Sequence, residues 1–460
     1  MGEFGLDSTQ MIIALIVGII LLIYMILRTK IHTFLALIIA AIFIGVVGGI
    51  PAEAVITAVE TGFGSTLGSI GIIIGFGVMM GAIFEKSGAA ERMAYTFIKL
   101  FGKGREEEAL AVTGFIVSIP IFVDSGFVIL VPIAKALSRA TKKSIVSLSV
   151  ALASGLVITH SLVPPTPGPV GVAGIFGANV GSVILWGIII GIPMAIASLI
   201  YARWIGKRIY QIPADVEGGE EWIRPNQDEV KVVDAEFDTE NLPSTAISFA
   251  PILVPLIMIL VGTFVNLFDV SDTVQTVVNF IGSPIVAVGT GLLVAIIFLA
   301  KHMSRSETID AMEAGISSAG IILLVTGGGG ALGEVLTISG VGEYLSGFIA
   351  DSNIPALLIP FLISTLMRFV QGSGTVAMIT AASMTAPIMQ SLGVDPVFAT
   401  LSACIGSLFM SHFNDSFFHV VNRSIGIKEA KEQMQVWSAP TTIMWAIGFV
   451  ALLIVNGIFG

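Results

Sequence analysis

Long apolar runs separated by short polar segments dominate the hydrophobic pattern of this chain. They cover 11–27, 33–50, 67–84, 144–163, 183–202, 246–268, 275–300, 311–338, 396–413 and 438–459. Each run approaches the roughly 20 residues that a helix needs to cross a bilayer. Only helices or closed barrels satisfy their backbone hydrogen bonds in lipid, and the runs lack the alternation of a barrel. The pattern therefore predicts an all-α polytopic membrane protein.

The amino-acid composition and the motifs that are missing exclude several classes of function. Of the 460 residues, 12% are charged, against about 25% in soluble domains. The net charge of −10 argues against a nucleic-acid partner. The single cysteine, Cys404, excludes an intramolecular disulfide framework and a cysteine-based metal cluster. Neither a phosphate-binding loop nor a zinc-protease motif occurs. We therefore expect no cofactor, no metal and no enzymatic activity, and as the energy source an ion gradient or the gradient of the substrate itself.

The charge pattern predicts a re-entrant hairpin in the first half. The acidic N-terminus does not resemble a cleavable signal peptide, so the first run is expected to stay as a helix. Basic residues at Arg28 and over 86–105 indicate the cytoplasmic side. The stretch 109–137 follows, is interrupted by Pro120, and ends in more basic residues. Both of its ends are thus predicted to be cytoplasmic, which is the pattern of a hairpin that enters and leaves by one face.

The second half gives the opposite orientation. Lys301 and Arg305 indicate the cytoplasmic side, so the run 311–338 crosses outward, and acidic residues flank 355–392. This second hairpin is predicted to enter from outside. The domain prediction is an N-terminal repeat over 1–205, a polar acidic cytoplasmic loop over 206–245, and a C-terminal inverted repeat over 246–460. The loop is expected to be solvated, with some helix.

Weak internal similarity supports the repeat. Six positions match between 75–91 and 327–343 at one offset of 252, from Gly75 with Gly327 to Glu91 with Glu343. The sequence thus predicts two inverted copies, each with about five transmembrane helices and one re-entrant hairpin. Such repeats with broken elements are an architecture of secondary transporters, which bind substrate between the breaks.

Polar residues near these breaks form the predicted substrate-binding set. Arg368 is the principal cation, suited either to grip a carboxylate through two hydrogen bonds or to pair internally and hold the hairpin. Small hydroxyl and glycine residues supply further donors, or only pack the hairpins. The full predicted set is Arg368, Ser125, Gly126, Gln371, Gly372, Ser373, Gly374, Thr375, Thr159, Thr166 and Asn414.

Three titratable residues are candidates for ion coupling. Asp124 could carry a proton, bind a sodium ion, or pair with Arg368. His160 precedes a proline-rich break at 164–169 and could titrate near neutral pH or remain a buried, hydrogen-bonded side chain. Asp415 could bind a cation or cap the following helix.

Several motifs together resemble the gluconate permease family. They are "THSLVPPTPGPVG", "FVQGSGTVAMITAA" and "SHFNDSFFHVVNR", and the resemblance extends over roughly 11–459. It implies proton symport of gluconate, glycerate, D-serine or related acids across the bacterial inner membrane. It also implies a homodimer whose hairpin-containing halves move against a scaffold, an elevator-like form of alternating access. Thr166 stands where the family often has histidine, and Asp124 where glutamate can occur, so gluconate is only the leading candidate.

The sequence thus predicts a multi-pass proton symporter for a small hydroxylated carboxylate. Its expected partners are the anionic substrate, protons, membrane lipid and a second copy of the chain. Sodium coupling, D-serine-type transport, a passive channel and, in a different class, a membrane-embedded enzyme are the alternatives.

Overall fold

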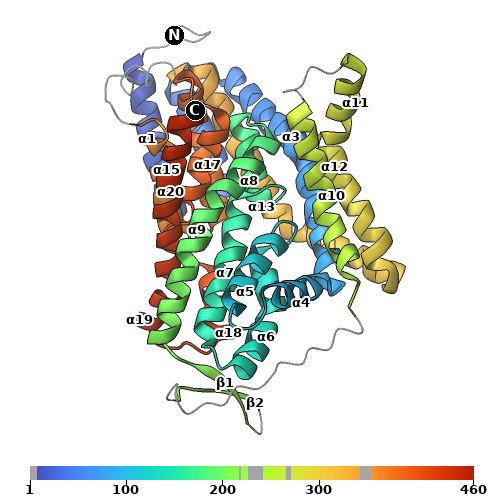
Figure 1. Cartoon of the computed structure of the whole chain (residues 1–460). Coiled ribbons are helices and arrows are strands. Elements are labelled where there is room, and N and C mark those ends of the chain that lie inside the picture. Colours follow the sequence, from blue (N-terminus) through green and yellow to red (C-terminus); the bar gives the residue numbers. More distant parts are fainter. Residues whose placement is uncertain (1–7, 217–218, 226–241, 266–270, 342–354) are drawn as a thin grey trace.

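The computed structural model describes residues 8–216, 219–225, 242–265, 271–341 and 355–460. These residues form a helical bundle with one small β-hairpin at the end where α6 and α9 finish (Figure 1). Seven described helical segments are long and apolar enough to cross a membrane, with Ile145–Phe176 counted as one, and the bent helix α3 makes an eighth. The predicted all-α membrane fold is therefore confirmed.

Nine helices make up the described part of the first half. They are α1 (Ser8–Arg28), α2 (Thr33–Val47), α3 (Ala52–Lys86), α4 (Ala89–Phe101), α5 (Glu106–Val117), α6 (Val123–Thr141), α7 (Ile145–Leu162), α8 (Pro167–Phe176) and α9 (Val180–Arg208). Helix α3 bends by 43° between Ala52–Gly68 and Ile70–Lys86, in a stretch rich in glycine and serine that permits such a kink.

The second half continues with helices and a few tighter or wider turns. Its helices are α10 (Thr245–Phe264), α11 (Asp272–Gly282), α12 (Pro284–Val294), α13 (Arg305–Ser339), α15 (Leu358–Gln371), α16 (Gly374–Ser391), α17 (Pro396–Gly406), α18 (Ser416–Ser424), α19 (Ala430–Gln433) and α20 (Ala439–Phe459). A π-helical turn, Ala295–Leu299, and a 3₁₀ turn, Ala300–His302, follow α12, and another π-helical turn, Met434–Ser438, precedes α20.

Three sequence predictions need correction. The run 275–300 is broken at Ser283, because Pro284 lacks the backbone donor to continue α11 and instead begins α12. The run 396–413 stops being helical after Gly406. The acidic segment predicted as a loop with some helix contains an antiparallel pair, β1 (Ile212–Val216) and β2 (Gly219–Ile223), with Ile212 opposite Ile223.

The two halves follow a similar order of elements. Helices α3 and α13 are each 35 residues long and pack along each other more extensively than any other described pair. Each is followed, after an interval, by two shorter helices joined at a break: α5 and α6, then α15 and α16. Glu343, used to predict the repeat, and Asp351, one of the acidic residues that flank 355–392, lie outside the described residues. The inverted relation of the halves stays a prediction.

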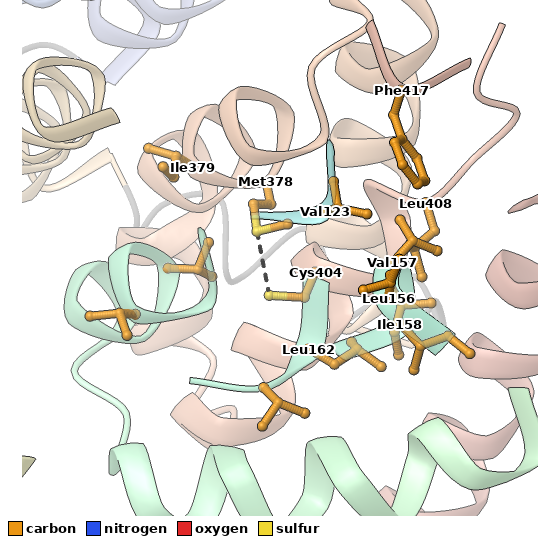
Figure 2. Packing of buried hydrophobic residues seen from close by; sticks show 14 of the residues in the cluster. Val123, Leu156, Val157, Ile158, Leu162, Met378, Ile379, Cys404, Leu408 and Phe417 are labelled. Carbon is orange, nitrogen blue, oxygen red and sulfur yellow. Dashed lines mark hydrogen bonds between the residues drawn. The ribbon is translucent and has the colours of Figure 1, made fainter. Parts of the chain in front are cut away.

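A buried apolar cluster holds the ends of the broken helices together. Cys404 of α17 lies 3.8 Å from the sulfur of Met378 on α16, and Val157 of α7 lies in the same cluster (Figure 2). Val123, the first residue of α6, and Phe417, the second residue of α18, are also buried there. Close packing of this kind has few voids, so it fixes the positions of the polar groups beside it.

Candidate substrate-binding site

Four helix breaks interrupt the helices that supply most polar groups of the site. They lie at 118–122 between α5 and α6, at 163–166 between α7 and α8, at Gly372–Ser373 between α15 and α16, and at 407–415 between α17 and α18. Gly372 adopts a left-handed φ of +80°, which glycine tolerates without strain. Ser373 then caps α16 by accepting a hydrogen bond from the Val376 amide at 3.4 Å.

A cavity of about 290 Å³ lies where three of these helices begin. Its walls include the first two residues of each one: Val123 and Asp124 of α6, Gly374 and Thr375 of α16, and Ser416 and Phe417 of α18. Helix N-termini carry partial positive charge and free N–H groups. The convergence of three N-termini favours an anion in this cavity.

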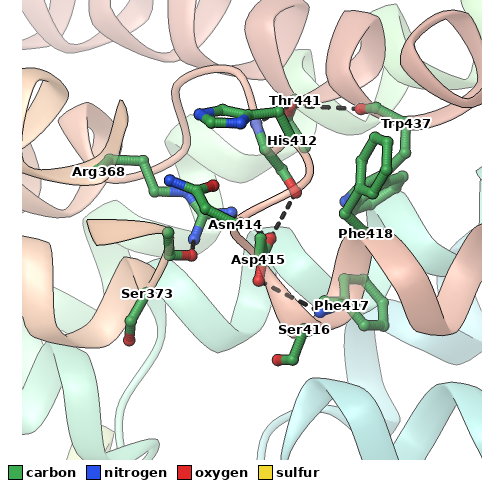
Figure 3. Close-up of polar contacts among 12 residues, drawn as sticks. Arg368, Ser373, His412, Asn414, Asp415, Ser416, Phe417, Phe418, Trp437 and Thr441 are labelled. Carbon is green, nitrogen blue, oxygen red and sulfur yellow. Dashed lines mark hydrogen bonds and ion pairs between the residues drawn. The ribbon is translucent and has the colours of Figure 1, made fainter. Parts of the chain in front are cut away.

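Arg368 and Asp415 form a buried ion pair at the cavity wall (Figure 3). Arg368 Nη2 donates to Asp415 Oδ2 at 2.5 Å, and the two side chains are only 7% and 9% exposed. Arg368 Nη1 also donates to the Gly372 carbonyl. Asp415 accepts a hydrogen bond from the Ser411 hydroxyl and caps α18 through the Phe417 amide at 3.2 Å. Arg368 therefore pairs with Asp415 in this structure and not with Asp124, and it joins the second hairpin tip to the α17–α18 break.

Asp124 faces this pair from the opposite hairpin. Its Oδ1 accepts a long hydrogen bond of 3.4 Å from Ser416, and the described residues include no ion-pair partner for it. The charges of Arg368 and Asp415 cancel to first order. An ionised Asp124 therefore leaves the cavity wall with one unbalanced negative charge.

Three polar side chains at the cavity keep unused hydrogen-bonding atoms, and Nε of the paired Arg368 is one of these atoms. Both amide atoms of Gln371 and Nδ1 of His160 are buried and have no protein partner. Buried polar atoms without a partner are costly and normally bind water or a ligand. Gln371 and His160 are thus available to a bound molecule, whereas the Asn414 amide nitrogen donates to the Phe369 carbonyl at 3.0 Å.

The structure brings most of the predicted residues to this one cavity and separates four from it. Ser125 lines another cavity of about 230 Å³ between α3, α13 and the first hairpin tip, and Gly126 is buried in α6. The Thr159 hydroxyl is buried without a partner, and the Thr166 hydroxyl donates to the Val163 carbonyl at 2.7 Å. The predicted residues at the main cavity are Asp124, His160, Arg368, Gln371, Gly372, Ser373, Gly374, Thr375, Asn414 and Asp415.

Four hydroxyl residues at the cavity were not predicted. They are Ser161, Ser407, Ser416 and Thr441. Ser416 follows Asp415 directly and Ser161 follows His160, so each of these two lay beside a predicted residue. Within the described part of the chain, no three His, Cys, Asp or Glu side chains converge as a metal site would require.

Broken helices that meet around a polar cavity inside a membrane-length bundle are the architecture of a secondary transporter. The chain belongs to the GntP family of permeases, whose model matches residues 10–458, and the resemblance to gluconate permeases is thereby confirmed. It is accordingly a multi-pass plasma-membrane protein of a transporter family.

Similar proteins agree with this assignment. An uncharacterized permease of Haemophilus influenzae is 46% identical over 99% of this chain and 94% of its own length. A gluconate permease of Pseudomonas aeruginosa is 32% identical over 98% and 99% of the two chains. Among solved structures, MtrF of Neisseria gonorrhoeae, described within a class of antimetabolite efflux pumps, superposes with a TM-score of 0.67 at 12% identity, over 95% of this chain and 97% of its own. That last similarity concerns the fold alone.

Proposed function

We propose that this permease imports gluconate or a related small hydroxylated carboxylate together with protons, across the bacterial inner membrane and without chemical change. Membership of the GntP family and the name of the Pseudomonas aeruginosa relative support the substrate class. The cavity of about 290 Å³ is near the lower end of the roughly 300–1,000 Å³ typical of small-molecule sites. A small acid is therefore favoured over a large one.

The position of Asp124 is the observation that supports the coupling of substrate transport to protons. With Arg368 and Asp415 paired, an anion that enters beside an ionised Asp124 meets a like charge in a partly desolvated space. Protonation of Asp124 removes that repulsion, so proton and anion each favour binding of the other. His160, at the same cavity, is the second candidate for the coupled proton.

Several groups have suitable chemistry for the substrate. The N-termini of α6, α16 and α18 attract the carboxylate. Gln371, His160 and the hydroxyls of Ser161 and Thr375 can read the substrate hydroxyl groups, since all four residues line the cavity. Arg368, paired with Asp415, positions the second hairpin tip beside these groups.

An elevator-like movement and a homodimer complete the proposal. Helices α3 and α13 form an extensive pair, which we assign to the scaffold. The broken helices that surround the cavity are assigned to the moving part. This division is supported by the separate cavity between α3, α13 and the first hairpin tip, because such space lets two bodies shift against each other.

Uptake of labelled gluconate into proteoliposomes tests the proposal. In sodium-free buffer, an inwardly directed proton gradient should drive accumulation above the external concentration, with the label recovered unchanged. Accumulation that requires sodium instead would show that sodium, and not the proton, is the coupling ion. Equilibration without accumulation would indicate a channel, and a chemically altered label would indicate an enzyme.

A further inference from the structure

A third cavity, of about 480 Å³, lies at the predicted cytoplasmic end of α9. Its walls come from the end of α9, the start of α7 and the turn between α6 and α7. Four basic residues line it, namely Lys142, Lys143, Arg203 and Lys207, together with one acid, Glu107. The transport proposal above uses none of these residues.

Ion pairs neutralise only part of this positive charge. Lys143 Nζ lies 2.8 Å from Glu106 and also pairs with Glu107, and Arg203 Nη2 lies 2.5 Å from Glu108. The whole cluster thus has four bases against three carboxylates. In the described structure Lys142 and Lys207 have no ion pair, so the uncompensated charge belongs to these two side chains.

An apolar stripe on α9 leads to the cavity. Ile189, Ile192, Ile196 and Ile200 are 38%, 52%, 56% and 64% exposed. Steps of three or four residues place them on one helix face, and the same steps continue to Arg203 and Lys207. Gly187, Gly191, Met194, Ser198 and Ala202 are buried on the other side of the helix. One face of α9 therefore changes from apolar to basic within a single turn.

Aromatic residues indicate the depth of that change in the membrane. Trp204 is 49% exposed and its ring lies 5.3 Å from that of Tyr201. The Arg208 guanidinium lies 5.4 Å from the centre of the Trp204 ring. Tyrosine and tryptophan concentrate at the membrane–water interface, so Arg203 and Lys207 lie at the level of lipid headgroups.

We propose that this cavity binds the headgroup of an anionic phospholipid. Lys142 and Lys207 hold the phosphate, and an acyl chain lies along Ile200, Ile196 and Ile192. Basic pockets between membrane helices on the cytoplasmic side bind anionic headgroups by this chemistry. The site is separate from the substrate cavity, and the proposal does not depend on the identity of the transported acid.

Lipid titration of the purified full-length protein tests the site. Phosphatidylglycerol and phosphatidylcholine are each added in detergent, and bound lipid and unfolding temperature are measured by native mass spectrometry and thermal shift. Phosphatidylglycerol should be retained and should stabilise the protein more than phosphatidylcholine. The K142Q/K207Q variant should bind it roughly thirtyfold more weakly, since each juxtamembrane lysine contributes about a fivefold gain in affinity for an anionic lipid.

Two controls separate a specific site from general charge. K99Q/K301Q removes two exposed lysines elsewhere on the predicted cytoplasmic side and should leave binding unchanged. K142R/K207R keeps the charge and should retain the lipid. The proposal is overturned by equal affinity for both lipids, by equal losses in the K142Q/K207Q and K99Q/K301Q variants, or by inorganic phosphate stabilising the protein as well as the lipid does.

The other possible occupant of the stripe is a second copy of the chain. Cys404 is the single cysteine and is buried, so I196C in a C404A background offers one accessible thiol. Failure to form a cross-linked dimer, with accessibility to a lipid-soluble thiol reagent, supports a lipid-facing stripe. Efficient disulfide formation between two copies would assign this face to the dimer interface and overturn the lipid proposal.

Discussion

Arg368 and Asp415 lie 47 positions apart in the sequence, yet they form a buried pair at the cavity wall. Desolvation costs make the net contribution of such a pair small, whereas loss of one partner leaves an uncompensated buried charge. Because the Gly372 carbonyl and the Ser411 hydroxyl also bond to this pair, its main effect is to fix the second hairpin tip against the α17–α18 break.

Removal of the arginine should therefore destabilise the protein strongly. We expect R368A to lower the free energy of unfolding by about 3–5 kcal/mol. R224Q, which breaks the more exposed pair of Arg224 with Glu432, should cost less than about 1 kcal/mol. Thermal unfolding in detergent measures both. The R368A/D415N double variant should recover part of the loss, and no recovery would contradict the uncompensated-charge argument.

A substitution at Asp124 tests the proposed coupling between proton and substrate transport. D124N cannot release a proton, so the variant should lose accumulation driven by a pH gradient while it still exchanges internal for external substrate. Gradient-driven uptake and counterflow in proteoliposomes distinguish the two activities. E53Q is the matched control, because Glu53 also lies in the first turn of a helix but is exposed. If D124N retained proton-driven accumulation, another group would carry the coupled proton, and His160 would be tested next.

Among the secondary-structure elements, the break between α15 and α16 depends most on one residue. Gly372 has φ +80°, and a Cβ atom placed on it would come within 2.6 Å of the Asn414 carbonyl carbon. Both the backbone conformation and the close approach to the α17–α18 break require glycine. This position is where two breaks that are distant in sequence meet.

A pair of glycine substitutions separates these two requirements. Gly393 also has a positive φ, of +66°, but has open space around its Cβ position. G393A should therefore lose only about 1 kcal/mol from backbone strain. G372A should lose more stability and also reduce gluconate binding, because Asn414 must move. Equal effects of the two substitutions on stability and binding would show that the contact with Asn414 is unimportant.

The hydrophobic pattern predicted most membrane helices, and its failures have local causes. The start of α3, from Ala52, was missed because its glycines and acids lower the hydropathy, although the segment packs against α13. The 396–413 run looked continuous, but its polar end, from Ser407, contributes to the cavity and is not helical. Hydropathy measures preference for lipid and cannot identify a segment that is buried in protein without being a helix.

Prediction of the site succeeded where residues lie beside a visible break. Gln371 to Thr375 follow such a signal and line the cavity. Ser125 also lies close to a break but does not line this cavity. One residue along a helix turns the side chain by about 100°, which directs Ser125 away from the cavity that Asp124 faces. Thr441 was not predictable, since α20 reaches the cavity only through tertiary packing.

Across the molecule, the contact of α3 with the first hairpin tip lies between the two bodies that are proposed to move. A Cβ atom on Gly81 would come within 3.1 Å of the Pro120 carbonyl carbon and still closer to its oxygen, whereas one on Gly75 would meet no atom within 4 Å. Both glycines lie on the same helix. The tip can therefore approach α3 closely at one point.

G81V should displace the tip and block transport. The added side chain overpacks the contact, which typically costs about 1–3 kcal/mol, and the conformation seen here should become less populated. G75V, with the same change of residue on the same helix, should transport normally. Uptake and gluconate affinity are measured for both; equal transport by the two variants would mean that this contact does not limit the movement.

The length of α3 and α13 has a consequence for the surrounding lipid. A straight helix of 35 residues is about 50 Å long, well beyond the roughly 30 Å of bilayer hydrocarbon. Tilt and the bend in α3 reduce the height that this pair spans. The tilt with the lowest mismatch cost changes with bilayer thickness. The permease is thus expected to sense hydrophobic mismatch, with its turnover rate depending on the acyl-chain length of the membrane in which it is reconstituted.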